Sequence, residues 1–281
     1  DGATKDVYMN GHDAGLKGTL TDGATKATFK VAAGALDDGK KVTIGGKEYT
    51  IGSKTADVQD TVDGLNASGD KVTVNGKTYT YCKTTDKTPA NQTPGADGWF
   101  ADDNTTTTAD TITIASGDKV TVASADGNTK GSYIAADMTD GVSDSDSSVI
   151  SAEKAISLMK GELTTANNIG ATKTAATIDD GTTYDSATGA TFTINKGTAE
   201  VAEKLNFNLH VGSDADMTNK INVNIETMSS SYLGIKGLNV SDDTGVSATY
   251  AVDAIADALQ KVSDQRSSLG AVQNRLEHTI A

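Results

Sequence analysis

The stretch that decides the fold class reads Val252-Asp-Ala-Ile255-Ala-Asp-Ala-Leu259-Gln-Lys-Val262-Ser-Asp-Gln-Arg266-Ser-Ser-Leu269-Gly-Ala-Val-Gln273-Asn-Arg-Leu276-Glu-His-Thr-Ile280. Its apolar side chains recur at alternating spacings of three and four residues, and two polar residues occupy the gaps. We call these nine positions the heptad ridge: Val252, Ile255, Leu259, Val262, Arg266, Leu269, Gln273, Leu276 and Ile280. This spacing predicts a long, coiled-coil-like helix with one apolar stripe.

A lone amphipathic helix cannot bury its own apolar stripe. No comparable heptad pattern occurs upstream in the 281 residues. We therefore expect the partner helices to come from another molecule or from a part of the protein outside this chain. Because the chain starts at Asp1 and not at a methionine, we expect a longer parent protein, which would carry any export signal.

Two upstream segments repeat one hairpin pattern. Residues 40–51 and 70–81 alternate polar and apolar side chains around Gly45-Gly46 and Asn75-Gly76. Such dipeptides supply the positive φ angles of a two-residue hairpin turn. Residues 117–122 repeat the first strand only, which predicts a third hairpin with a longer or irregular connection.

The remaining elements follow from shorter patterns. Helices are predicted over residues 56–66 and 148–167, the latter with Ser151 as a candidate cap, and a helical turn over 199–205. Strands are predicted over 191–195, 206–211 and 220–226, the last two joined through a turn at 212–214. Residues 93–110 are predicted to be a loop, in which Trp99 and Phe100 fill a small core.

Together these patterns predict an α+β fold. We expect an elongated, multi-domain chain whose outer domains consist of hairpins and short helices, followed by the long C-terminal helix. The predicted domains are residues 1–135, 136–205 and 206–281.

Composition excludes several classes of function. The chain holds 24 basic and 38 acidic residues, a formal net charge of -14, which disfavours binding to nucleic acid or to anionic membranes. Its single cysteine, Cys82, rules out an intrachain disulfide. No apolar run approaches the roughly 20 residues of a membrane-spanning helix.

No motif predicts catalysis or a cofactor. The histidines, His12, His210 and His278, stand in unrelated contexts, and the metalloprotease pattern His-Glu-x-x-His is missing from the sequence. An acidic run, Asp137, Asp140, Asp144 and Asp146, lacks the glycine and glutamate of an EF-hand, so a solvated loop is favoured over a calcium site. We expect a protein that is not an enzyme and holds no metal or other cofactor.

A family resemblance rests on the last quarter of the chain. The C-terminal region of bacterial flagellins is resembled by residues 209–212, 221–225, 228–229, 233–235, 237–241, 254–261 and 265–280. The closing Leu269-Gly-Ala-Val-Gln-Asn-Arg-Leu-Glu-His-Thr-Ile280 stretch carries most of this resemblance. Residues 40–66 resemble a short insertion motif of the flagellin variable region. The resemblance implies a secreted structural subunit that polymerises with its own kind into the flagellar filament and serves motility.

Flagellin architecture assigns further roles by resemblance. The heptad ridge would pack in the filament wall against N-terminal helices of the same protein and against other subunits, and residues 1–205 would project outward. The flagellin-sensing Toll-like receptor is an implied partner, with Gln273 and Arg275 as possible contacts. Because the main receptor surface lies on the N-terminal helices, we expect weak or no activation by this chain alone.

Two alternatives remain open from the sequence. A hook-filament junction protein would share the helical ends, although we expect it to match the closing stretch less closely. A surface adhesin or glycan-binding module would instead use the Trp99 region.

Overall fold

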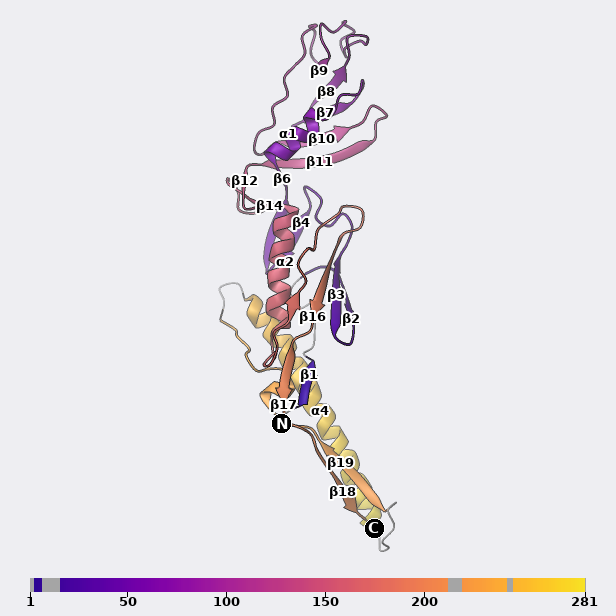
Figure 1. The fold of residues 1–281 in the computed structure, drawn as a ribbon, viewed down its shortest axis with the longest axis vertical. Coiled ribbons are helices and arrows are strands. Elements are labelled where there is room, and N and C mark those ends of the chain that lie inside the picture. Colours follow the sequence, from indigo (N-terminus) through magenta and orange to yellow (C-terminus); the bar gives the residue numbers. More distant parts are fainter. Residues whose placement is uncertain (1–2, 7–15, 212–218, 242–244, 281) are drawn as a thin grey trace. The chain divides into compact units, whose positions relative to one another are not determined.

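The computed structural model describes residues 3–6, 16–211, 219–241 and 245–280. Its helices and strands make an α+β fold, as predicted (Figure 1). The chain divides into two compact units, the first formed by residues 1–31, 159–182 and 191–281 and the second by residues 32–158 and 183–190. Each unit draws on separated stretches of chain, whereas the three consecutive domains of the sequence analysis stay a prediction.

Both repeated hairpins in the second unit form as predicted. The paired strands are β4 (Lys41–Ile44) with β5 (Lys47–Ile51), and β7 (Lys71–Val74) with β8 (Lys77–Cys82). In the turns φ is 55° and 74° at Gly45 and Gly46, and 50° and 88° at Asn75 and Gly76. Positive φ at both turn residues matches the twist of the flanking strands, and Gly and Asn adopt it at the lowest cost.

The first hairpin belongs to a five-stranded sheet with the order β12-β13-β14-β5-β4. The other three strands are β12 (Met138–Thr139), β13 (Val142–Ser143) and β14 (Val149–Ile150). β14 runs parallel to β5 and places Ile150 beside Ile51, where both side chains are fully buried. The chain therefore leaves this sheet after Ile51 and returns to it at Met138.

Between these two points the chain builds a six-stranded sheet in the order β6-β11-β10-β7-β8-β9. Its further strands are β6 (Ser53–Lys54), β9 (Gly98–Ala101), β10 (Lys119–Ala123) and β11 (Thr129–Ala136). The predicted third hairpin is the β10-β11 pair, whose register shifts between Val122 and Ala123. Helix α1 (Thr55–Asp63) packs Val58 and Val62 into one core with the valines of β7 and β10.

Trp99 fills this core and is only 9% exposed, as the sequence analysis predicted. Its ring meets Tyr81 edge-on at a centroid distance of 5.3 Å. The loop prediction for residues 93–110 is wrong over β9, because Trp99 and Phe100 pair with β8 and extend the sheet. The local polar composition does not indicate this pairing, because the partner strand β8 lies some twenty residues earlier in the chain.

In the first unit, a four-stranded sheet has the order β15-β16-β3-β2. Its strands are β2 (Thr19–Asp22), β3 (Lys26–Val31), β15 (Thr177–Ile178) and β16 (Ala190–Asn195), and β16 covers the predicted strand. Phe29 and Phe192 are buried on neighbouring strands, with ring centroids 6.3 Å apart. This aromatic pair anchors the apolar core of the sheet.

The helical turn predicted over residues 199–205 is wrong. Residues there form β17 (Thr198–Val201), which pairs antiparallel with β1 (Ala3–Asp6). Ala199 and Val201 are buried and Glu200 between them is exposed, which is the alternation of a strand. The partner strand lies at the other end of the chain, so only the tertiary structure reveals the pairing.

Helices α2 (Ala152–Asn167), α3 (Ser230–Leu233) and α4 (Val246–Ile280) complete the described helices together with α1. The predicted cap at α2 is present, since Ser151 Oγ accepts a hydrogen bond of 3.2 Å from the backbone N–H of Lys154. The predicted C-terminal hairpin is β18 (Leu205–His210) with β19 (Lys220–Ile225). The predicted turn at 212–214 lies outside the described residues. Within the described part of the chain, no helix is long and apolar enough to cross a membrane.

Candidate functional site

The long helix α4 carries the heptad ridge and is the candidate site. It spans 35 residues, about 50 Å at 1.5 Å per residue. It follows Gly245, whose φ of 75° separates it from the preceding chain. Side-chain pairs one turn apart support its surface, among them Gln260 with Asp264 at 2.8 Å and Gln273 with Glu277 at 2.9 Å.

One face of α4 packs against its own unit. Tyr250, Ala251 and Ala258 are buried there, and the Tyr250 hydroxyl donates a 2.5 Å hydrogen bond to Glu162 Oε2 on α2. Further along, β19 lies beside α4 (Figure 1). Gln265 joins the two, because its amide donates to Asn224 O at 3.1 Å and accepts from the Glu226 N–H at 3.2 Å.

The heptad ridge is only partly on that packed face. Its upstream members Val252, Ile255 and Leu259 are 64%, 46% and 65% exposed. Of the other members, the apolar Val262, Leu269 and Leu276 are half-buried and the polar Arg266 and Gln273 are exposed, while the side chain of Ile280 lies outside the described residues. The role of the ridge in packing stays a prediction, but its upstream apolar part has no cover within the described chain.

Helix geometry explains this split. A stripe with the heptad period of 3.5 residues turns by about 20° per heptad around a straight helix, or about 80° over four heptads. The packed face instead follows the true helical period through Ala251, Ala254, Ala258, Leu269 and Leu276. The two stripes therefore meet at the end of α4 and separate toward its start, where small alanines pack inward and large apolar side chains point outward.

The hairpin beside α4 adds exposed apolar surface that the sequence analysis did not single out. Cross-strand pairs put Leu205, Phe207 and Leu209 of β18 on one face with Ile225, Val223 and Ile221 of β19. Ile221 and Val223 are buried, whereas Leu205 and Phe207 are 58% and 37% exposed. The alternating pattern in 205–209 was available in the sequence, but which strand the helix covers was not.

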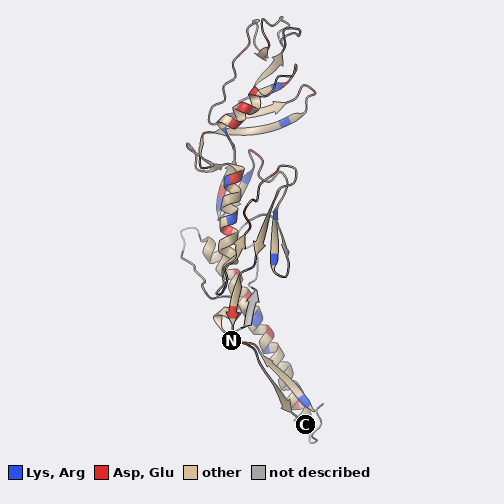
Figure 2. Ribbon diagram, viewed as in Figure 1, with Lys and Arg blue, Asp and Glu red and all other residues tan. Residues whose placement is uncertain are grey.

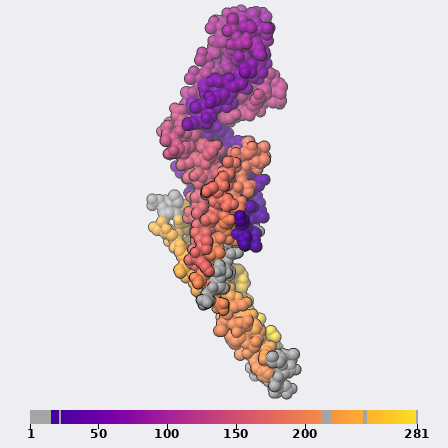
Figure 3. All heavy atoms as spheres, viewed as in Figure 1, coloured from indigo at the N-terminus to yellow at the C-terminus, as the bar shows by residue number. Residues whose placement is uncertain are grey.

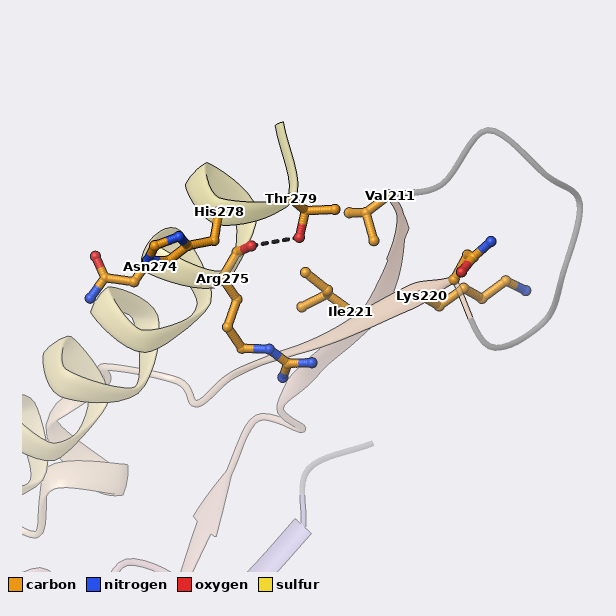
Figure 4. Close-up of a pocket in the computed structure, with 8 residues that line it drawn as sticks. Val211, Lys220, Ile221, Asn274, Arg275, His278 and Thr279 are labelled. Carbon is orange, nitrogen blue, oxygen red and sulfur yellow. Dashed lines mark hydrogen bonds between the residues drawn. The ribbon is translucent and has the colours of Figure 1, made fainter. Parts of the chain in front are cut away.

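A pocket of about 360 Å³ lies where the last turns of α4 meet this hairpin (Figure 4). Its lining includes Lys220, Arg275 and His278, and the described residues contribute no acidic side chain to it. Figure 4 shows Arg275 reaching from α4 toward β19, one turn below Thr279, whose hydroxyl donates to Arg275 O at 2.7 Å. Of the two possible receptor contacts, Arg275 thus lines the pocket, and Gln273 lies outside it on the exposed surface.

No metal-binding grouping appears in the described residues. None of their His, Cys, Asp and Glu side chains gather in a group of three or more that could hold a metal ion, and His12 lies outside them. In the acidic run, Asp146 accepts hydrogen bonds from the N–H and hydroxyl of Ser148 at 2.9 and 2.7 Å, which lower the pKa of its carboxyl. The aspartate therefore holds a turn, in a segment that also contains the short paired strands β12 and β13 and is not a continuous loop.

Comparison with known proteins links part of the chain to flagellins. A Bacillus subtilis protein provisionally named flagellin YvzB is 45% identical over 74 residues, which cover 26% of this chain and 45% of that protein. The flagellin of B. subtilis is 35% identical over 103 residues, covering 30% and 33% of the two chains. The flagellin of Clostridium tyrobutyricum is 44% identical over 71 residues, covering 24% and 18%.

The chain thus covers less than half the length of each of these relatives. No protein-family model matches the chain, and no solved structure matches it. At least a quarter of this chain is nevertheless homologous to flagellins, in agreement with the resemblance found in the sequence.

Proposed function

We propose that this chain, homologous in part to flagellins, belongs to a structural subunit of the bacterial flagellar filament. The protein would be exported, would assemble with further copies of itself outside the cell and would serve motility. Flagellins and flagellar filament core proteins among its relatives support this proposal. No observation favours a hook-filament junction protein, and the burial of Trp99 disfavours a glycan site built on it.

The exposed upstream part of the heptad ridge carries the proposal. Val252, Ile255 and Leu259 stand in a row on a helix of which another face is already packed. Burying each large aliphatic side chain contributes about 1.5–3 kcal/mol. A second helix laid along this row would gain that energy, and the N-terminal helices of the same protein and neighbouring subunits are the proposed source.

The proposed arrangement assigns the rest of the chain by analogy with flagellins. Residues 1–205 would face the medium, and their acidic composition suits a solvated surface. The proposed role is structural, so we assign no reaction and no cofactor to the protein.

The experiment replaces ridge residues in the full-length protein that contains this chain. We expect Val252→Asp/Leu259→Asp to abolish filaments in electron micrographs and motility on soft agar, because two carboxylates cannot be buried between helices. Circular dichroism of the isolated chain should be unchanged, since both side chains are exposed in it.

Ser263→Asp/Ser267→Asp is the matched control, because both serines are exposed on the same helix outside the ridge. It should leave filaments and motility intact. Filaments of normal length in the ridge variant would refute the packing role.

The flagellin-sensing Toll-like receptor is a finer part of the proposal. Gln273 and Arg275 are both exposed on α4, as receptor contacts must be. In the full-length protein, we expect Arg275→Ala to weaken receptor binding severalfold, and unchanged binding in a titration would remove Arg275 from the contact.

A further inference from the structure

One face of the six-stranded sheet of the second unit is covered by α1. The opposite face is covered over β8 and β9, where Cys82 and Phe100 are buried, and is more open over β7, β10 and β11. Pairing aligns a row of four hydroxyl residues across β11, β10, β7 and β8: Ser132, Thr121, Thr73 and Thr78. Because side chains alternate along strands, this row lies on the face opposite the core residues Val72, Val120 and Val122. Hydrogen bonds join the hydroxyls in pairs, Thr73 with Thr78 at 3.0 Å and Thr121 with Ser132 at 3.3 Å.

Lysines flank the hydroxyl row, with Lys71 and Lys119 on its face and Lys130 at the register shift of β11, where the alternation of side chains is interrupted. Lys71, Lys119 and Lys130 each lie two residues from a member of the row, and all three are exposed. The strands β7, β8, β10 and β11 contain no Asp or Glu, and the three lysines form no salt bridge within the described residues. We call Lys71, Thr73, Thr78, Lys119, Thr121, Lys130 and Ser132 the lysine face.

The other face of the same sheet is covered by an acidic helix. α1 carries Asp57, Asp60 and Asp63, which are all exposed, and it contains no basic residue. Acidic residues mark α1 and basic residues mark the strands in Figure 2. The exposed aspartates of α1 and the exposed lysines of β7 and β10 therefore lie on opposite sides of one sheet.

We propose that the lysine face binds α1 of a second copy of this chain. The two patches are complementary in charge and in number, with three lysines against three aspartates. Because they lie on opposite sides of one sheet, the contact is head to tail. Each copy can then hold one neighbour on each side, and the contact can repeat along a row of copies.

The contact is weak by itself. Exposed ion pairs contribute little and are screened by salt. A nine-residue helix on four short strands also gives a smaller contact than stable complexes have. The contact forms where copies are held close together. The proposed filament would supply this high local concentration, so the inference rests on the proposed function.

The experiment uses charge reversal in the isolated 281-residue chain at high protein concentration and low salt. Sedimentation equilibrium should detect self-association that high salt removes. Lys71→Glu/Lys119→Glu/Lys130→Glu should weaken it about tenfold, and so should Asp57→Lys/Asp60→Lys/Asp63→Lys, because each puts like charges opposite each other. An equimolar mixture of the two variants should associate again, since the reversed face of one meets the reversed helix of the other.

A charge-matched control separates this contact from net charge. Lys17→Glu/Lys83→Glu/Lys204→Glu removes three other exposed lysines and should keep self-association close to the wild-type level. Circular dichroism and Trp99 fluorescence check that every variant is folded.

Two results would overturn the proposal. One is a mixture that associates no better than its components. The other is heparin binding that is lost in the lysine variant while self-association is unaffected, which would make the face a site for an anionic polysaccharide. Since no filament is needed for these measurements, a chain that self-associates as described but is excluded from filaments would contradict the proposed function alone.

Discussion

Tyr184 joins two stretches of the second unit that lie far apart in the sequence. Its hydroxyl donates a 2.6 Å hydrogen bond to Asp37 and accepts one of 3.2 Å from the Leu36 N–H. Desolvation, and next the hydrogen bond to Asp37, raise the pKa of Tyr184 to about 12. No local pattern in the sequence indicates this contact, because it closes a loop of well over a hundred residues.

This raised pKa predicts a pH dependence of stability. Because the folded-state pKa lies above the ordinary value of about 10, the stabilisation is fully present below pH of about 10 and is lost as the pH rises toward 12. Tyr184→Phe should lower the free energy of unfolding by about 1 kcal/mol at neutral pH and should flatten its decline in that alkaline range. Urea unfolding at a series of pH values measures both effects.

Tyr49→Phe serves as the control, since it removes a hydroxyl and keeps the ring over which Lys47 lies at 5.0 Å. It should retain the wild-type pH dependence. A Tyr184→Phe profile parallel to that of the wild type would contradict the assigned role.

At the scale of elements, α4 shows what a heptad pattern can and cannot predict. The spacing of Val252, Ile255 and Leu259 predicted the helix, and the helix is present. The pattern did not predict which side of α4 is packed. Two stripes of side chains drift apart along the helix, and only the heptad ridge contains large apolar residues at its start. The inward stripe of Ala251 and Ala258 gave no signal, because alanine is common on any helix surface.

In the β18-β19 hairpin, too, the sequence predicted the elements but not which of them is covered. Alternation predicted both strands, and their cross-strand pairs place the apolar side chains on one face. Since α4 contacts β19, the apolar side chains Leu205 and Phe207 of β18 stay exposed. They extend the uncovered apolar surface of this unit beyond the heptad ridge.

At the scale of the whole molecule, each unit has its own aromatic core. Phe29 and Phe192 are fully buried in the first unit. In the second unit, Trp99 and Phe100 are buried on the two faces of β9. Separate cores of this kind allow the units to unfold as separate cooperative blocks.

We expect Phe192→Ala to destabilise the first unit by about 3–5 kcal/mol, because it leaves a cavity in the core of the sheet. The urea midpoint reported by Trp99 fluorescence should stay at the wild-type value, since the contacts of Trp99 lie in the second unit. The helical signal in circular dichroism, to which α4 contributes, should be lost at lower urea.

The matched variant is Phe100→Ala, which should shift the Trp99 transition by a comparable amount. Cys82, also buried in the second unit, offers a second probe through its reaction with a thiol reagent. If Phe192→Ala moved the Trp99 midpoint and the rate of Cys82 labelling together, the two units would be one cooperative block.

The sequence by itself determined those features whose cause is local: the turns at Gly45-Gly46 and Asn75-Gly76, the cap at Ser151, and the periodicity of α4. It also carried the resemblance to flagellins, because that rests on residue identity. The tertiary structure alone decided the β1-β17 pairing, the pairing of β9 with β8 that makes the segment around Trp99 a strand, and the face of α4 that stays open. These depend on contacts between residues far apart in the chain, whose geometry follows from packing and not from any nearby pattern.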